Sequence, residues 1–122
     1  MSLIRIATED GNVGHSFLGS ALGSGQRDAR VLIDALKPML VGQNAFDRER
    51  LWSDMMRRTR GSLIRPIGAV DVALWDLAGN SLGLPIHKLI GSYRNSVPAY
   101  ASSAVYATAE EYAEEAAQIK NE

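Results

Sequence analysis

The sequence contains no cysteine, and it also lacks long apolar runs and a secretory signal pattern. Without cysteine, neither a disulfide framework nor a thiolate metal site can form, and this composition fits a reducing compartment. No apolar run approaches the roughly 20 residues of a membrane-spanning helix, and the first residues lack a secretory signal pattern. We therefore expect a cytoplasmic protein that contacts no membrane.

An excess of charge of one sign is also lacking. The formal net charge is -1 and the isoelectric point is near 6.1, so no overall field favours nucleic acid. The densest basic cluster is Arg57, Arg58 and Arg60, and arginines at the end of a helix complement its negative pole. We expect no nucleic-acid partner.

The composition is otherwise ordinary for a globular protein, with 46% hydrophobic and 22% charged residues among 122. A chain of this length buries roughly two thirds of its unfolded surface. One domain, or one domain and a piece of another, is therefore expected.

Two β-branched segments, 3–8 and 13–18, flank an Asp-Gly turn and predict a β-hairpin. A two-stranded hairpin is marginal by itself and needs a third strand or a helix against it. The glycines and serines of residues 19–25 predict a mobile loop, and their spacing does not match a phosphate-binding GxGxxG turn.

Helical periodicity predicts three helices in the middle of the chain, over 26–40, 46–59 and 66–80. The first should bury Ile33 and its neighbours and be kinked or ended by Pro38. The second carries an apolar stripe that indicates core packing rather than a cofactor site, namely Leu51, Trp52, Met55 and Met56. The third is apolar almost all round, so we expect it to be the most buried element.

Asp71 and Asp76 are the only charges on the third predicted helix. They lie five residues apart, which places them on different faces, so they do not form an acid–base pair. We expect each to cap a neighbouring loop or to pair with an arginine such as Arg65 or Arg94.

The last part of the chain predicts a turn and short helix over 85–90, then a strand over 97–102. A Thr-x-x-Glu capping box at Thr108 and Glu111 opens a final helix that runs through Lys120. A strand followed by a helix suggests the first step of a parallel β/α arrangement.

Several motifs together resemble the enolase superfamily, in its mandelate racemase and muconate lactonizing enzyme family. They are the runs 14–18, 61–65, 68–79, 82–85, 88–91 and 97–103. The resemblance implies an α+β fold: an enolase-like N-terminal capping domain, an antiparallel β meander plus helical bundle, over residues 1–96. The first strand of that meander is missing here. Residues 97–122 would be the first strand and helix of a (β/α)7β TIM-like barrel. Asn80 and Ser92 depart from the family pattern at packing or turn positions.

The resemblance implies a Mg²⁺-dependent racemase or acid-sugar dehydratase that abstracts a proton alpha to a carboxylate. The family's base, a Lys-x-Lys motif, and its metal ligands lie on later barrel strands. The lysines here are Lys37, Lys88 and Lys120, and none matches. No catalytic residue and no metal ligand is therefore assigned to this chain, which alone is expected to be inactive.

Alternatives remain open at this point. The chain could be a catalytically inactive fragment or a small non-enzymatic interaction domain, and racemase, dehydratase and cycloisomerase are not distinguished. By resemblance, the expected partners are a small carboxylate or acid-sugar substrate, the remainder of the barrel and, in a homo-oligomer, further copies of the chain.

Substrate contacts are expected at two places. One is the second strand of the hairpin and the loop after it, which in the family reaches over the active site; for His15 a structural, hydrogen-bonded role is the alternative. The other is the end of the first barrel strand, because barrel sites are built at that face. The candidates are His15, Phe17, Leu18, Ser20, Ser102 and Ser103.

Overall fold

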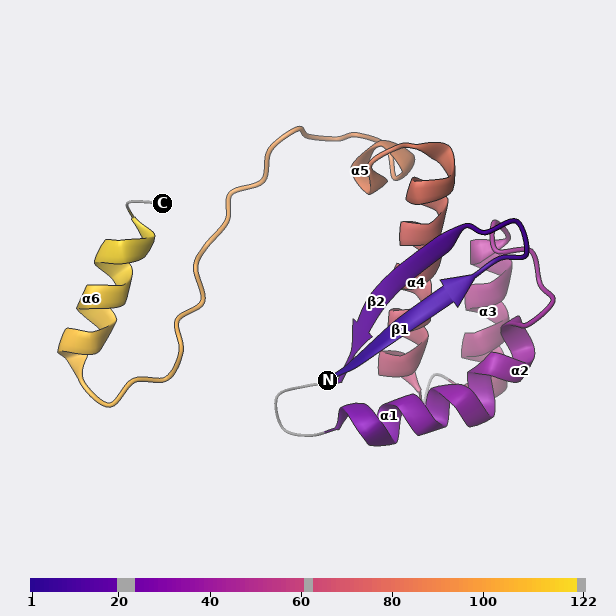
Figure 1. Ribbon diagram of the computed structural model, residues 1–122, viewed down its shortest axis with the longest axis horizontal. Helices are drawn as coiled ribbons and strands as arrows, with labels where there is room; N and C mark the ends of the chain where they lie inside the picture. Colours follow the sequence, from indigo (N-terminus) through magenta and orange to yellow (C-terminus); the bar gives the residue numbers. More distant parts are fainter. Residues whose placement is uncertain (20–23, 61–62, 121–122) are drawn as a thin grey trace. The chain divides into compact units, whose positions relative to one another are not determined.

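The computed structural model describes residues 1–19, 24–60 and 63–120. The chain divides into two compact units, Met1–Ser92 and Tyr93–Glu122. The first holds a β-hairpin and most of the helices, and the described residues of the second hold a single helix (Figure 1).

Strands β1 (Ser2–Ala7) and β2 (Val13–Leu18) form the predicted hairpin. They pair antiparallel, with Leu3 opposite Phe17 and Arg5 opposite His15. Gly11 adopts φ +91° in the turn, a conformation that glycine takes without a steric penalty. Thr8 N–H donates to the Asn12 carbonyl at 3.0 Å and closes the turn.

Helix α4 (Ile64–Leu82) is the central element of the first unit and buries nine residues. The prediction that this helix is the most buried element is confirmed. It ends at Gly83, which is left-handed and thus suits glycine. Helix α4 packs along β2 so closely that a Cβ at Gly14 would lie 2.1 Å from the Ala73 carbonyl oxygen.

The first predicted helix is three consecutive helical segments: α1 (Gly25–Val31), the π-helical η1 (Leu32–Leu36) and α2 (Lys37–Leu40). Pro38 has no N–H to continue the α-helical ladder, and just before it Lys37 N–H donates to the Leu32 carbonyl, five residues back. The expectation of an inward-facing Ile33 is wrong, since Ile33 is 55% exposed. The π turn changes the angular spacing on which that expectation rested, and Leu32 and Leu36 are the buried residues.

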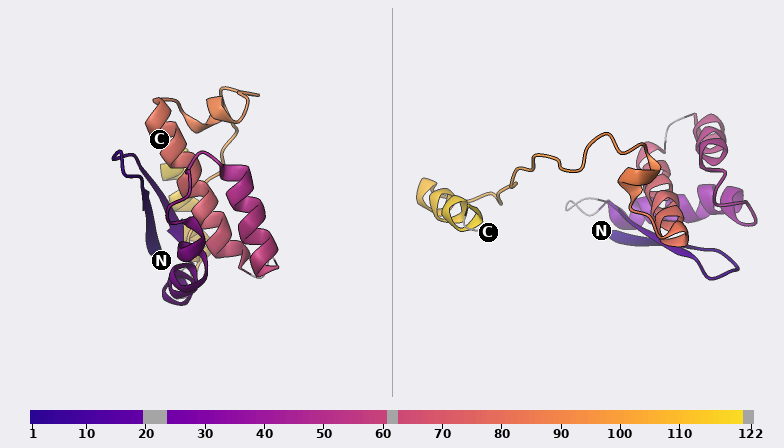
Figure 2. Two further views of the ribbon diagram at one scale, coloured as in Figure 1. Left: turned by 90° about the vertical axis from the view of Figure 1, so that its right-hand side faces the viewer. Right: turned by 90° about the horizontal axis from the view of Figure 1, so that it is seen from above.

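Helix α3 (Arg48–Thr59) confirms the predicted core stripe. Leu51 and Met55 are buried, and Trp52 and Met56 pack against the same cluster. The short α5 (Ile86–Leu89) follows Pro85, as predicted. Figure 2 shows α4 lying between the hairpin and α3, so one apolar core is shared by the sheet and the helices.

The second unit confirms one prediction and corrects another. Helix α6 (Ala109–Ile119) has the complete capping box between Thr108 and Glu111. Residues 97–102, in contrast, have irregular backbone and form no strand in this structure. A strand is held by hydrogen bonds to a neighbouring strand, and none of the described residues pairs with this segment.

None of the helices in the described part of the chain is long and apolar enough to cross a membrane.

Candidate functional site

The outer face of β2 carries two of the candidate residues. Along this strand, residues alternate between a face packed on α4 and a face open to solvent. His15 and Phe17 lie on the open face, and Phe17 is 71% exposed beside its cross-strand neighbour Leu3, which is 60% exposed. This face therefore offers an apolar end and, at Arg5 and His15, a basic end.

The other candidates lie elsewhere. Leu18 is 3% exposed and belongs to the hydrophobic core, so its side chain anchors the end of β2 instead of facing outward. Ser20 lies outside the described residues. Ser102 and Ser103 lie on exposed, irregular backbone of the second unit.

Gly19 and Gly25 approach each other closely, on either side of residues 20–23, which lie outside the described part of the chain. A Cβ at Gly19 would lie 2.5 Å from the Gly25 Cα, and Gly19 adopts φ +108°. Ser2 Oγ donates to the Gly25 carbonyl at 3.1 Å. The predicted mobility of the 19–25 loop concerns mainly those undescribed residues.

An ion pair that the sequence did not reveal lies beside these glycines. Arg65 at the start of α4 pairs with Asp28 of α1, with 2.6 Å between Nη2 and Oδ2. Arg65 also donates to Ser24 Oγ. Among the alternatives expected for Asp71 and Asp76, a pair with Arg65 is not observed, because α1 packs against the start of α4 and brings Asp28 to this arginine.

Asp76 faces β2. Its Oδ2 accepts a hydrogen bond from the His15 backbone N–H at 2.8 Å and lies 3.9 Å from His15 Nδ1. Asn80, one turn further along α4, donates both to Asp76 at 3.2 Å and to the Val13 carbonyl at 3.0 Å. The side chains of α4 thus hold the strand that carries His15 and Phe17.

Asp71 lies in different surroundings, as the five-residue spacing predicted. Partial burial raises the pKa of this carboxyl, and the nearby Arg48 guanidinium opposes the shift. Arg48 itself stacks on Trp75, with its Cζ 3.8 Å from the ring centroid. Asp71 and Asp76 do not form a catalytic pair.

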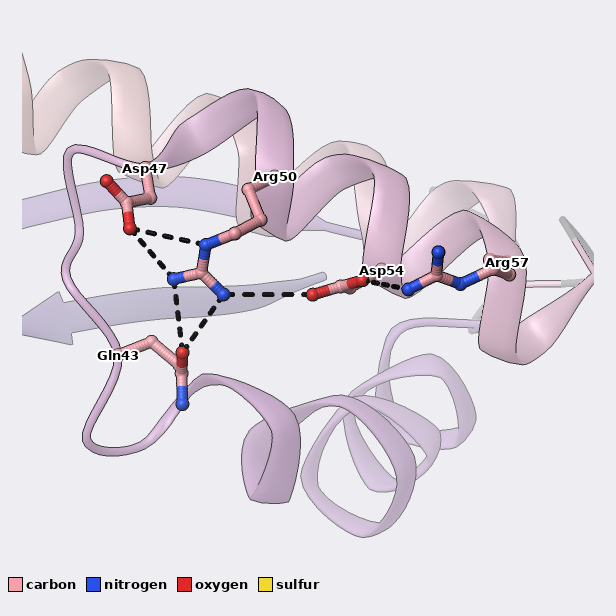
Figure 3. Close-up of polar contacts among 5 residues, drawn as sticks. All are labelled: Gln43, Asp47, Arg50, Asp54 and Arg57. Carbon is pink, nitrogen blue, oxygen red and sulfur yellow. Dashed lines mark hydrogen bonds and ion pairs between the residues drawn. The ribbon is translucent and has the colours of Figure 1, made fainter.

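Three charged side chains of α3 pair with one another or with the N-cap residue Asp47 (Figure 3). Arg50 contacts Asp47 at 2.9 Å, Asp54 at 3.8 Å and the amide oxygen of Gln43 at 3.1 Å. Asp54 also pairs with Arg57, a member of the basic cluster at the end of the helix. One arginine of that basic cluster is thus paired with a carboxylate of its own helix.

A metal centre needs several converging ligands. Within residues 1–19, 24–60 and 63–120, no group of three or more histidine, aspartate or glutamate side chains converges.

Comparison with known proteins places these features in a family. Residues 1–91 match the family model described as mandelate racemase / muconate lactonizing enzyme, N-terminal domain. The chain belongs to this family. An arabinonate dehydratase of Saccharolobus solfataricus is 38% identical over 109 residues, which cover 84% of this chain and 28% of that protein.

Solved structures agree with this assignment. An enolase superfamily member from Polaromonas sp. JS666 has a TM-score of 0.82 and 28% identity over 98% of this chain and 34% of its own. A mandelate racemase/muconate lactonizing enzyme from a marine actinobacterium, in complex with magnesium, has a TM-score of 0.65 and 33% identity over 76% of this chain and 28% of its own.

The comparisons confirm the predicted fold class, an enolase-like capping domain of antiparallel strands and helices. The likeness to the Polaromonas protein spans 98% of the chain and so extends into the residues expected to begin the barrel. The chain spans only about 28% of the length of the arabinonate dehydratase.

Proposed function

We propose that this chain is the N-terminal part of a Mg²⁺-dependent enzyme that removes a proton alpha to the carboxylate of an acid sugar and eliminates water. The observation that carries the proposal is the 38% identity to an arabinonate dehydratase across 84% of the chain. Other relatives are a D-xylonate dehydratase and a D-galactarolactone cycloisomerase. Dehydration is thus the reaction that we propose for the whole enzyme, and cycloisomerisation is the second candidate.

The described residues do not fit a Mg²⁺ site. The ion wants several oxygen ligands in octahedral geometry, and no such group converges among them. The glutamates of α6 follow one another along a single helix, where negative charge near the N-terminus suits the helix dipole. We therefore assign the metal ligands and the base to a barrel outside this chain, and no chemical step to the chain itself.

The contribution of this chain in our proposal is to cover the substrate. His15 and Phe17 would contact it from the outer face of β2, where both are exposed, while Leu18 holds the strand end in the core. Ser20, Ser102 and Ser103 stay proposals that rest on the family resemblance. The division into a capping domain (1–96) and a barrel start (97–122) and the homo-oligomeric state rest on it too. The cytoplasmic location stays a proposal that rests on the composition of the sequence.

A chimera tests the proposal. Residues 1–91 replace the matching segment of the Saccharolobus solfataricus arabinonate dehydratase, and dehydration of arabinonate with Mg²⁺ is followed through the 2-keto product. We expect the chimera to retain activity and the 122-residue chain alone to show neither turnover nor tight Mg²⁺ binding by calorimetry. In the chimera, Phe17→Ala should alter KM, and the exposed Lys37→Ala should not.

A folded chimera without activity would overturn the assignment. Turnover or micromolar Mg²⁺ affinity of the isolated chain would show that the site lies within these residues.

A further inference from the structure

The outer edge of β2 has backbone groups that β1 does not use. In an antiparallel pair, alternate residues direct both N–H and C=O toward the partner strand or away from it. The Thr8–Asn12 bond sets this alternation, and with the observed register it turns the backbone groups of Val13, His15 and Phe17 away from β1. Such an edge is a template for another strand.

Two side chains of α4 occupy part of this edge. Asp76 accepts from the His15 N–H at 2.8 Å, and Asn80 donates to the Val13 carbonyl at 3.0 Å. A hydrogen bond of 3.2 Å joins the two side chains. They therefore bond one donor and one acceptor in the positions that an incoming strand would use.

The edge of β1 is different. No described residue bonds to the outward backbone groups of Leu3 or Arg5. The two edges of the hairpin, formed by strands of six residues each, thus differ in how accessible they are to a further strand.

We propose that Asp76 and Asn80 close the outer edge of β2 against strand addition, above all by β2 of a second copy of this chain. A second copy is the partner to exclude, because antiparallel pairing of two identical strands is self-complementary. Centred on His15, it uses the outward backbone groups of both copies and places Phe17, 71% exposed, opposite Val13 of the other copy. Further strands then join this sheet only along β1. The inference does not depend on the proposed enzymatic function.

The double variant Asp76→Ala/Asn80→Ala tests the closure. We expect hydrogen exchange of the His15 amide to accelerate about tenfold, since its hydrogen bond is lost. Sedimentation velocity over a concentration series should show self-association beyond that of the wild type. Asp76→Asn keeps an oxygen acceptor and should behave as the wild type, and so should Asp71→Ala, which changes the aspartate of α4 that does not face β2.

Cysteine trapping identifies the edge. Because the chain has no cysteine, His15→Cys in the double variant should form disulfide-linked dimers, since pairing centred on this residue places the two Cα atoms about 5.5 Å apart, within reach of a disulfide. Leu3→Cys in the same background should show no increase over its wild-type counterpart. If the double variant loses its helical circular dichroism, Asn80→Ala alone replaces it and should still increase trapping at His15→Cys. A folded variant that associates and crosslinks no more than the wild type overturns the proposal.

Discussion

Gly14 is the position where β2 lies closest to α4, and Gly14→Ala should destabilise the first unit strongly. A Cβ there would lie 2.1 Å from the Ala73 carbonyl oxygen, 2.5 Å from the Leu77 nitrogen and 2.7 Å from the Leu77 Cβ. The first two are backbone atoms of a buried helix, so no flexible side chain can move aside. The strand must instead retreat from the helix by roughly 1 Å, until ordinary van der Waals contact is restored.

That retreat has a cost that the structure lets us estimate. Overpacking costs about 1 to 3 kcal/mol. The displacement also stretches the Ser16–Ala69 and His15–Asp76 hydrogen bonds, now 2.6 and 2.8 Å, each worth about 1 kcal/mol. The lower entropy of the unfolded alanine chain offsets about 0.4 to 1 kcal/mol. We expect a loss of about 2 to 4 kcal/mol.

Urea unfolding followed by circular dichroism measures this loss. Gly68→Ala is the control, because Gly68 lies in α4, the helix against which Gly14 packs, and a Cβ added there meets no atom within 4 Å. That variant should gain about 1 kcal/mol from helix propensity. Unchanged stability of Gly14→Ala, or equal effects of the two substitutions, would refute the close-approach argument.

Three further predictions concern α4. Leu74→Ala should lower the unfolding free energy by about 2 to 5 kcal/mol in the same urea assay, because a side chain that is 3% exposed leaves a cavity; a loss below that of a surface substitution would contradict it. Arg65→Ala should lower the unfolding free energy by about 1 to 2 kcal/mol, because it leaves the largely buried Asp28 carboxylate without its ion pair. An unchanged unfolding free energy would show that water replaces the guanidinium. Burial raises the pKa of the Asp71 carboxyl above its ordinary value of 3.8, so the folded chain favours the protonated form. The contribution of this carboxyl to stability is therefore present below pH 3.8 and is lost as the pH rises through the pKa of the folded state. Asp71→Asn should therefore become more stable relative to the wild type between pH 4 and pH 7, and parallel pH–stability curves would exclude the linkage.

Local patterns in the sequence were sufficient for several elements. The Asp-Gly turn, the near-absence of charge on α4 and the Thr108–Glu111 capping box each involve residues within a few positions of one another, and each predicted element is observed. The family resemblance was also readable from the sequence, because its motifs are short runs in a fixed order. Of the candidate site, the sequence indicated the strand but not which of its side chains face outward.

Long-range packing decided the rest. Period-two alternation places Phe17 and Leu18 on opposite faces of β2, and only the position of α4 makes Leu18 the buried one. The Arg65–Asp28 pair and the Asp76–His15 bond join residues 37 and 61 positions apart, which no local pattern specifies. Residues 97–102 have the composition of a strand but lack a hydrogen-bonding neighbour among the described residues. A helix satisfies its own backbone within one turn, whereas a strand depends on another segment. The sequence alone therefore determined where the helices and the local hairpin lie. Only the tertiary structure decided the state of residues 97–102, the π-helical segment and the contacts of the site.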